Sequence, residues 1–276
     1  MSDQGLAAVR VSFAYEGGAP VLNDVTAHVG RGGLVGILGP NGSEKTTLLR
    51  LLAGLLSPLA GRVLLDGDDV RAIGRRDVSR RMAMVPQETQ LAFEYTVLEM
   101  AVMGRYPHLG AFEIEGPDDI AIAREALGAT GTQHLESRLF NTLSGGEKQR
   151  VVIAGALAQL GKGFRDRNLF LLLDEPTASL DLAYQLEIRA ILAKLNHDRG
   201  LTIVVSTHDL NFAAGLCRDL ILLDRGQVLA AGPTASMLDA ALIRRLYGVE
   251  VDIATNARTG QLTVIPVSRA EDRPSS

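Results

Sequence analysis

Apolar residues recur along this chain with two different spacings, and the change between them divides the sequence into parts. Near the N-terminus they alternate with polar residues over 8–15 and 25–29, which predicts two strands of an antiparallel sheet. Residues 61–70 are predicted to form a hairpin that turns at Asp66 and Gly67. Continuous apolar runs predict further strands, buried on both faces as in a parallel sheet covered by helices, at 34–39, 82–87, 169–174, 201–206 and 220–232.

From about 90 to 165 the apolar residues follow the period of a helix. Thr96 and Glu99, and later Ser144 and Glu147, have the spacing of a capping box, which marks the starts of two helices. Further helical patterns cover 46–56, 117–131, 143–160 and 183–196. The chain is therefore predicted to be an α/β protein with an N-terminal antiparallel β subdomain. A helical subdomain, about 90–165, is inserted in a single domain of residues 1–268, and the polar tail 269–276 is expected to be disordered.

Composition and charge narrow the class of protein. With 276 residues, 46% apolar and 22% charged, the chain has the make-up of an ordinary soluble globular protein. A net charge of −4 gives no basic footprint, so nucleic acid is not an expected partner. The five histidines lack metal-ligand spacing, and the single cysteine, Cys217, is expected to be a buried small side chain.

The sequence predicts neither a transmembrane helix nor a secretory signal. Its apolar runs are far shorter than the roughly 18–20 residues that cross a bilayer. The N-terminus has no basic segment followed by an apolar core. We therefore expect a cytoplasmic protein that reaches a membrane only through a partner.

Residues 39–47, GPNGSEKTT, match a phosphate-binding loop at all positions but one. The pattern G-x-x-x-x-G-K-[ST] is met by Gly39, Lys45 and Thr46, while Glu44 stands where the last glycine belongs. The loop lies between a predicted strand and a predicted helix, where backbone N–H groups and the helix N-terminus form a cradle for polyphosphate. The candidate binding residues of this loop are Gly39, Pro40, Asn41, Gly42, Ser43, Glu44, Lys45, Thr46 and Thr47.

The most specific segment is LSGGEKQR, residues 143–150. A capping box between Ser144 and Glu147 explains its ends but not the paired glycines, Gly145 and Gly146. Glycines at a helix N-terminus leave bare N–H groups that a phosphate can approach closely. This segment is the signature of ATP-binding cassette (ABC) ATPases, and the chain resembles that family, in the right order, over nearly its whole length.

The resemblance implies an ABC ATPase core of the P-loop NTPase class and assigns roles to further residues. Asp174, at the end of LFLLLD, would hold Mg²⁺ through water, and Glu175 would polarise the attacking water. Gln87 resembles the Q-loop glutamine, His208 the switch histidine and Tyr15 the aromatic that stacks on adenine. Taken singly, a histidine or a tyrosine at a strand end is more often structural. The resemblance also names residues in three sets: the signature Ser144, Gly145, Gly146 and Glu147, the D-loop Ser179 and Asp181, and the metal site Thr46, Gln87 and Asp174.

The same resemblance implies the cofactors and the assembly. ABC ATPases use ATP and Mg²⁺ and bind each ATP between the P-loop of one protomer and the signature of the other, so one copy of each implies a homodimer. The strings GRYPH (104–108), MLDAALIRRLYGVEVDI (237–253) and GQLTVIPV (260–267) resemble ATPase subunits of importers for ferric siderophores, haem and cobalamin. This implies two permease subunits, a periplasmic or lipid-anchored binding protein, and a peripheral location on the cytoplasmic face of the inner membrane. An iron chelate is the favoured cargo.

Two alternatives remain open. A soluble ABC ATPase of translation or DNA repair usually has two cassettes or a long coiled coil, for which the chain has no room. A catalytically impaired regulatory subunit is supported by Glu44 alone. At about 4–5 Å and an effective dielectric of about 20, each carboxylate–phosphate pair costs ~3–4 kcal/mol, less if the carboxylate turns to solvent or to Lys45. We therefore expect weak ATP binding and slow turnover.

Overall fold

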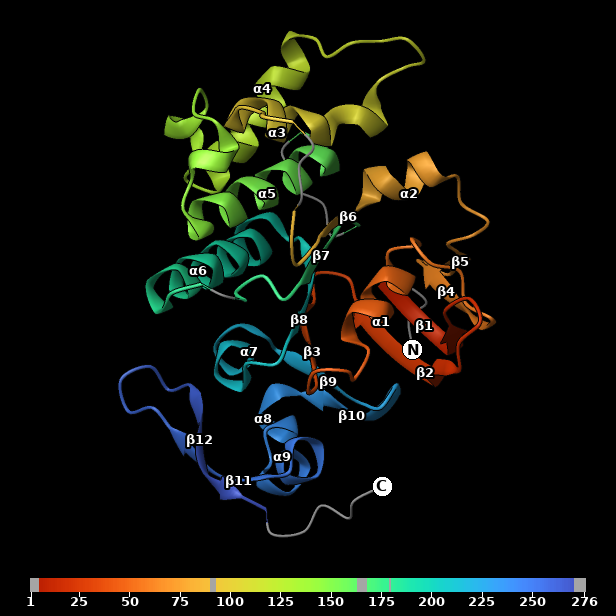
Figure 1. Cartoon of the computed structure of the whole chain (residues 1–276), viewed down its shortest axis with the longest axis vertical. Coiled ribbons are helices and arrows are strands. Elements are labelled where there is room, and N and C mark those ends of the chain that lie inside the picture. Colours follow the sequence, from red (N-terminus) through yellow and green to blue (C-terminus); the bar gives the residue numbers. More distant parts are fainter. Residues whose placement is uncertain (1–4, 90–92, 163–167, 179, 271–276) are drawn as a thin grey trace. The chain divides into compact units, whose positions relative to one another are not determined.

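The computed structural model describes residues 5–89, 93–162, 168–178 and 180–270 of the chain (Figure 1). These residues belong to two compact units. The first unit comprises 1–29, 33–67 and 204–276, and the second comprises 30–32 and 68–203. The predicted disordered tail falls largely on 271–276, which lie outside the described residues.

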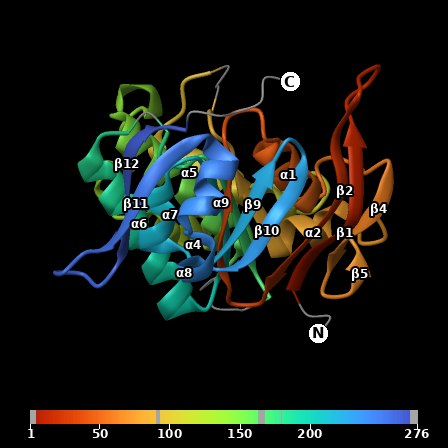
Figure 2. The same cartoon turned by 90° about the horizontal axis from the view of Figure 1, so that it is seen from below.

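The first unit begins with the predicted antiparallel sheet. Its strands β1 (Gly5–Ala14), β2 (Pro20–Gly30) and β4 (Ala60–Leu65) are neighbours in the order β2-β1-β4 (Figure 2). Beyond β4 the chain turns at Asp66 (φ 56°) and Gly67 (φ 93°) into β5 (Asp68–Asp69). Positive φ at both central residues is the geometry of a tight hairpin turn, so the hairpin prediction is confirmed.

A second set of strands in this unit is mixed rather than wholly parallel. The fully buried β3 (Leu34–Leu38) runs parallel to β9 (Asp219–Asp224), with Leu38 opposite Leu222. In contrast, β10 (Gln227–Pro233) pairs antiparallel with β9. The sequence suggested one apolar run over 220–232, but Arg225 (φ 45°) and Gly226 (φ 73°) break it into a hairpin. A two-residue turn of this kind reverses the chain, so the added strand is antiparallel.

The helices of the first unit are α1 (Lys45–Leu52), α7 (Leu210–Leu216), α8 (Thr234–Met237) and α9 (Ala240–Tyr247). A C-terminal hairpin of β11 (Val249–Thr255) and β12 (Leu262–Arg269) was not predicted as an element. Asn211 of α7 anchors it, because its Nδ2 donates to the Val264 carbonyl at 3.1 Å and its Oδ1 accepts from the Val264 N–H at 2.8 Å.

The second unit contains a parallel strand pair and most of the helices. Strand β6 (Met82–Val85) runs parallel to β7 (Phe170–Asp174), with Val85 opposite Leu173. Strand β8 (Thr202–Thr207) crosses the boundary between the units. The helices are α2 (Arg75–Arg81), α3 (Val97–Val102), α4 (Pro117–Ala129), α5 (Gly145–Leu160) and α6 (Leu182–Arg199), with 3-10 turns η1 (Met103–His108), η2 (Gln133–Leu135) and η3 (Phe140–Thr142).

Both predicted capping boxes are present. The Thr96 hydroxyl accepts from the Glu99 N–H and the Ser144 hydroxyl accepts from the Glu147 N–H. In return, the Glu99 carboxylate accepts from the Thr96 N–H at 2.7 Å, and that of Glu147 from the Ser144 N–H at 2.8 Å. These bonds satisfy N–H groups that a helix start would otherwise leave without partners, and they lower the pKa of both carboxyls.

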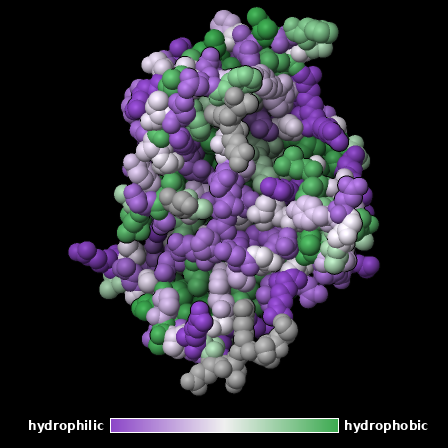
Figure 3. Space-filling view, viewed as in Figure 1, coloured by the Kyte–Doolittle hydropathy of each residue, from purple (hydrophilic) through white to green (hydrophobic). Residues whose placement is uncertain are grey.

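Within the described ranges, no helix combines the length and the apolar character needed to cross a bilayer. Hydrophilic residues cover much of the face drawn in Figure 3.

Cys217 is buried, as expected from the sequence, and burial raises the pKa of its thiol to about 12.

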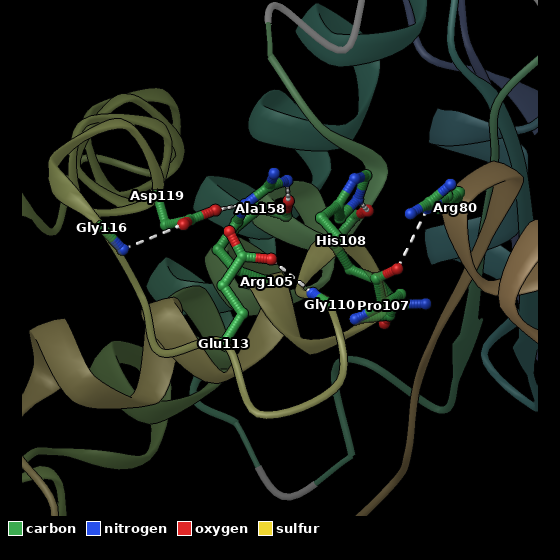
Figure 4. Close-up of polar contacts among 10 residues, drawn as sticks. Arg80, Arg105, Pro107, His108, Gly110, Glu113, Gly116, Asp119 and Ala158 are labelled. Carbon is green, nitrogen blue, oxygen red and sulfur yellow. Dashed lines mark hydrogen bonds and ion pairs between the residues drawn. The ribbon is translucent and has the colours of Figure 1, made fainter.

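The GRYPH string forms η1, and its polar groups brace it against the neighbouring helices (Figure 4). The buried Arg105 donates from Nε to Asp119 Oδ1 at 2.9 Å and from Nη1 to the Ala158 carbonyl at 2.8 Å. His108 Nε2 lies 2.7 Å from the Gln159 carbonyl, and burial lowers the pKa of its imidazole. The string is thus a structural brace between α4 and α5.

Helix α2 also contacts this brace. Arg76 and Arg80 each donate from Nε to the Pro107 carbonyl, at 2.8 and 3.0 Å. Arginine reaches such a carbonyl while most of its side chain stays near water, which is why the sequence did not reveal the contact.

We expect Asp119→Asn to lower the free energy of unfolding by about 2–3 kcal/mol, because the substitution leaves the Arg105 guanidinium without its charged partner. The Arg105 hydrogen bond lowers the pKa of Asp119, so the carboxylate stabilises the fold above its unfolded-state pKa of about 3.9. Its contribution is lost as the pH falls through the folded-state pKa. Denaturant unfolding should therefore show a difference in unfolding free energy between parent and variant that is smaller in acid than at pH 7.

The exposed neighbour Asp118 supplies the matched control, since Asp118→Asn removes the same charge from the same helix turn. It should change the unfolding free energy by less than about 0.5 kcal/mol. Equal losses in the two variants would contradict a specific role for the Arg105–Asp119 pair.

Candidate functional site

The residues predicted to bind nucleotide occur in both units. Tyr15, the P-loop 39–47 and His208 belong to the first unit. Gln87, the signature 144–147, Asp174, Glu175 and Asp181 belong to the second. Ser179, predicted for the D-loop, lies outside the described residues.

The P-loop follows β3 and leads into α1, as predicted. Gly39 has no room for a side chain, because a Cβ there would lie 2.3 Å from the Leu223 carbonyl oxygen and 2.3 Å from Ser43 Oγ. Lys45 is buried and donates from Nζ to the carbonyls of Gly39 at 2.9 Å and Pro40 at 3.2 Å. The loop therefore folds back on its own lysine.

Two features of this loop fit a bound phosphate. The lysine ammonium lies within the loop, where it can neutralise an anion. The Ser43 hydroxyl is buried, and no hydrogen-bond partner for it lies among the described residues. A buried hydroxyl without a partner is costly in a protein, and a phosphate oxygen would satisfy it.

Glu44 adopts a backbone conformation suited to glycine. Its φ of 75° and ψ of 29° are left-handed, and it precedes the first residue of α1. This region costs a residue with a Cβ about 1–2 kcal/mol, whereas glycine occupies it freely. The motif's last glycine is therefore required by backbone geometry, in addition to the charge repulsion expected from the sequence.

The side chain of Glu44 joins the loop to Tyr15. The Thr47 hydroxyl donates to Glu44 Oε2 at 2.7 Å, and the Tyr15 hydroxyl lies 3.0 Å from Thr47 Oγ1. Since Thr47 gives its hydrogen to Glu44, Tyr15 is the donor in the second bond. The sequence had suggested solvent or Lys45 as the destination of the carboxylate, and did not suggest Thr47. This chain of three hydroxyl and carboxyl groups places the Tyr15 hydroxyl next to α1.

In the second unit, the parallel strands β6 and β7 end near the candidate residues Gln87, Asp174 and Glu175. Because Val85 lies opposite Leu173, Gln87 and Asp174 lie near the carboxyl ends of neighbouring strands: Asp174 is the last residue of β7, and Gln87 comes two residues after β6. Asp174 and Glu175 are buried, with 2% and 8% of their surfaces exposed, whereas Gln87 is exposed. Glu175 also has a positive φ of 47°. Non-glycine residues rarely adopt this conformation, and where they do they are found at functional sites as well as in turns such as those at Asp66 and Arg225.

The signature residues surround the start of α5. Ser144 and Gly145 are exposed there, and Ser144 caps the helix. The Glu147 carboxylate accepts from both the N–H and the hydroxyl of Ser144, at 2.8 and 2.9 Å, so it is engaged within its own helix. Gly146 is buried against the ring of Tyr184, a residue that sequence reasoning missed. The one feature of the sequence that could have indicated Tyr184 is the position of this aromatic residue, three residues after Asp181.

His208 follows β8 and is exposed. Its carbonyl accepts from the Tyr247 hydroxyl of α9 at 3.4 Å. The next residue, Asp209, caps α7 by accepting from the N–H groups of Asn211 and Phe212. The backbone of His208 is therefore fixed by the end of β8 at Thr207 on one side and by the helix cap at Asp209 on the other.

The strand–loop–helix arrangement of β3, the P-loop and α1 defines a P-loop α/β protein. Residues 22–178 match the ABC transporter family, and the chain belongs to that family. Its fold agrees with solved members. A putative metal-chelate type ABC transporter in an inward-facing conformation superposes with a TM-score of 0.82 at 27% identity, covering 96% of this chain and 98% of the other. A dimeric bacterial ABC transporter cassette superposes with a TM-score of 0.70 at 29% identity, covering 83% of this chain and 98% of the other.

Several curated relatives are named for import. The cobalamin import ATP-binding protein BtuD of Halobacterium salinarum is 41% identical over 91% of this chain, which spans only 61% of that protein's length. The hemin import ATP-binding protein HmuV of Bordetella pertussis is 39% identical, over 90% of this chain and 95% of its own. The ferric enterobactin transport ATP-binding protein FepC of Escherichia coli is 36% identical, over 90% of this chain and 89% of its own length.

The left-handed backbone at position 44 yields a prediction about stability. Glu44→Gly and Glu44→Ala both remove the Thr47 contact and differ only in a Cβ. We expect the glycine variant to be more stable by about 1 kcal/mol, since φ 75° penalises alanine. Thermal unfolding would measure the difference as about 2–4 °C.

Arg50, an exposed residue within α1, provides the control. There Arg50→Ala should be more stable than Arg50→Gly, because an ordinary helical position favours alanine by about 1 kcal/mol. The same order at positions 44 and 50 would contradict a conformational requirement at 44.

Proposed function

We propose that this chain is the ATP-binding subunit of an ABC importer whose cargo is an iron chelate, haem or cobalamin, with an iron chelate favoured. The observation that carries the proposal is the P-loop with its buried lysine and a buried Ser43 hydroxyl that has no partner among the described residues, in a chain that contains the full signature LSGGE. Relatives named for import of cobalamin, hemin and ferric enterobactin support the class of cargo.

The roles of individual residues follow the motifs. Lys45 and the loop N–H groups would bind the ATP phosphates, and Tyr15 would stack on adenine. Thr46, Gln87 and Asp174 would hold Mg²⁺, which neutralises charge on the phosphates when bound. Glu175 would orient the attacking water, with His208 at the γ-phosphate. These assignments use the same residues that the family's motifs place in this order.

The assembly would be a homodimer of this subunit with two permease subunits. A P-loop and a signature in one chain can complete an ATP site only with a second copy. Closure on ATP and opening after hydrolysis would switch the permease between inward-facing and outward-facing states. The ATPase would lie on the cytoplasmic face of the membrane, and the cargo would come from a periplasmic or lipid-anchored binding protein.

Glu44 would weaken this activity in two ways. Its carboxylate adds a negative charge at the mouth of a phosphate site. It also holds the Thr47 hydroxyl, and through it Tyr15, in a chain of hydrogen bonds next to the loop. The complete set of other motif residues argues for an ATPase with a single impairment. A regulatory subunit without turnover is the second candidate, and Glu44 is the observation in its favour.

We expect Glu44→Gly to bind Mg-ATP about 10²-fold more tightly than the parent, because it removes a charge repulsion of ~3–4 kcal/mol. Glu44→Gln keeps the shape of the side chain but not its charge, so its affinity for Mg-ATP should lie between those of the parent and Glu44→Gly. Calorimetric titration of ATP would give the three affinities, and turnover with the permease would give the corresponding rates.

Glu16→Gln serves as the control, since Glu16 is an exposed carboxylate beside Tyr15 and outside the loop. Its affinity for ATP should match that of the parent. Equal affinity and turnover in the parent and Glu44→Gly would refute an impairment by Glu44.

Purification from the source cells tests the proposal of an importer. We expect a tagged chain, extracted in mild detergent, to retain a multi-helix permease in a ratio of two ATPase to two permease chains. Association with ribosomes instead would favour a soluble ABC ATPase of translation. An uptake assay with radiolabelled siderophore, haem and cobalamin, in cells with and without the chain, would identify the cargo.

A further inference from the structure

The backbone around His208 is contacted by the C-terminal segment of the chain, residues 240–269, which is blue in Figure 1. This segment consists of α9 and the hairpin of β11 and β12, and it belongs to the same unit as the P-loop and His208. Strand β12 lies against α7, and β11 lies against α9. The predicted nucleotide-binding residues end at His208, so the C-terminal segment can influence hydrolysis only through such contacts.

The first contact is made by Asn211, in the first turn of α7. The hairpin is a two-stranded sheet, and both backbone groups of Val264 in β12 bond to the Asn211 amide, at 2.8 and 3.1 Å. Because the N–H and the carbonyl of one residue point to the same side of a strand, β12 has an open edge at Val264. The amide offers one donor and one acceptor, so it satisfies that edge as a further strand would.

The second contact is made by Tyr247, the last residue of α9. Its hydroxyl donates to the His208 carbonyl at 3.4 Å. The next residue, Gly248, ends the helix with a left-handed φ of 68°, and its carbonyl accepts from the Ala270 N–H at 3.0 Å. The end of α9 is thus tied to the end of the hairpin, and the two contacts come from one connected segment.

Short-range hydrogen bonds link these contacts to His208. The Asp209 N–H donates to Thr207 Oγ1 at 3.0 Å. Asp209 Oδ1 accepts from the N–H groups of Asn211 at 2.8 Å and Phe212 at 2.9 Å. Thr207 and Phe212 are buried at either end of this stretch. A displacement of Asn211 is therefore passed along the stretch to His208.

We propose that the C-terminal segment takes part in ATP hydrolysis and that Asn211 and Tyr247 are positioning residues for His208. Asn211 fixes the first turn of α7 on β12, and Tyr247 fixes the His208 carbonyl. Together they set the backbone from which the imidazole reaches the γ-phosphate. A shift of about 1 Å at a reacting centre can cost as much as about 10²-fold in rate, so such contacts matter for turnover. This inference rests on the proposed ATPase function.

Turnover tests the proposal in the complex with the permease, with Glu44→Gly as the parent so that ATP binding is not limiting. Asn211→Leu removes both bonds to β12 with a side chain of similar size, and Tyr247→Phe removes only a hydroxyl. We expect kcat to fall about tenfold in the first and about threefold in the second, whose bond is long. The affinity for ATP should be unchanged in both, because the P-loop is intact and only the transition state needs His208.

A double-mutant cycle with His208→Ala separates positioning from general damage. If Asn211 acts through His208, Asn211→Leu should lower kcat by less than about twofold in a chain that already lacks the imidazole. Single-turnover measurements extend the cycle to slow variants. Asn211→Asp keeps the acceptor for the Val264 N–H, so its kcat should lie between those of the parent and Asn211→Leu. Losses of Asn211→Leu and His208→Ala that multiply would overturn the inference.

Amide hydrogen exchange without ATP measures the same contacts independently of activity. The peptide 205–212 should exchange at least about threefold faster in Asn211→Leu and in Tyr247→Phe, because this segment opens more often when a contact is lost. Unchanged exchange in both variants would contradict the proposal.

Asn256→Leu is the matched control. Asn256 Oδ1 also accepts from backbone N–H groups, those of Arg258 and Thr259, but in the turn of the hairpin. The substitution should change neither kcat nor the exchange of 205–212. A loss of kcat as large as that of Asn211→Leu would show that any damage to the hairpin slows turnover, and would overturn a specific role for Asn211.

The outcomes separate this inference from the function on which it rests. If Glu44→Gly neither binds nor hydrolyses ATP, the proposed function is overturned and the inference with it. If that parent hydrolyses ATP but Asn211→Leu and Tyr247→Phe keep its kcat, the inference alone is overturned.

Discussion

Strands that are buried along their whole length constrain everything else in this protein. The side chains of β3 and β7 are all buried, on both faces. A polar group in the middle of such a strand would lose its hydration without a partner, so chemistry can only begin where a strand ends. The P-loop follows β3, Asp174 ends β7, and Gln87 lies two residues beyond β6. The parallel pairing of β6 and β7 then brings Gln87 and Asp174 to the same edge.

Backbone conformation adds a second constraint at these strand ends. Where a strand turns abruptly into a loop or helix, some residues must take a positive φ, and both Glu44 and Glu175 do so. At 175 the strained residue is the predicted catalytic carboxylate, as strained residues at functional sites often are. At 44 the family pattern has a glycine, which removes the strain. Glu44 thus combines a conformational cost with a misplaced charge, and its contact with Thr47 shows where that charge goes.

The helical part depends on a different kind of interaction, between polar groups at helix ends and side chains of neighbouring helices. Local hydrogen bonds define where α3 and α5 begin, through the pairs Thr96–Glu99 and Ser144–Glu147. Their placement depends on contacts far apart in sequence, such as Arg105 with Asp119 or Tyr184 against Gly146. A motif such as GRYPH or SGG therefore carries packing requirements as well as chemistry.

The amino-acid sequence by itself determined the family, the order of most strands and helices, the capping boxes, the Asp66-Gly67 hairpin and the anomaly at Glu44. Those features depend on residues close together in the chain, where spacing and residue type are enough. The tertiary structure decided what depends on distant partners. These are the antiparallel β10, the C-terminal hairpin held by Asn211, the Thr47 contact of Glu44 and the ring of Tyr184 over Gly146. No local pattern encodes such contacts, because whether two distant side chains meet depends on how the elements between them pack.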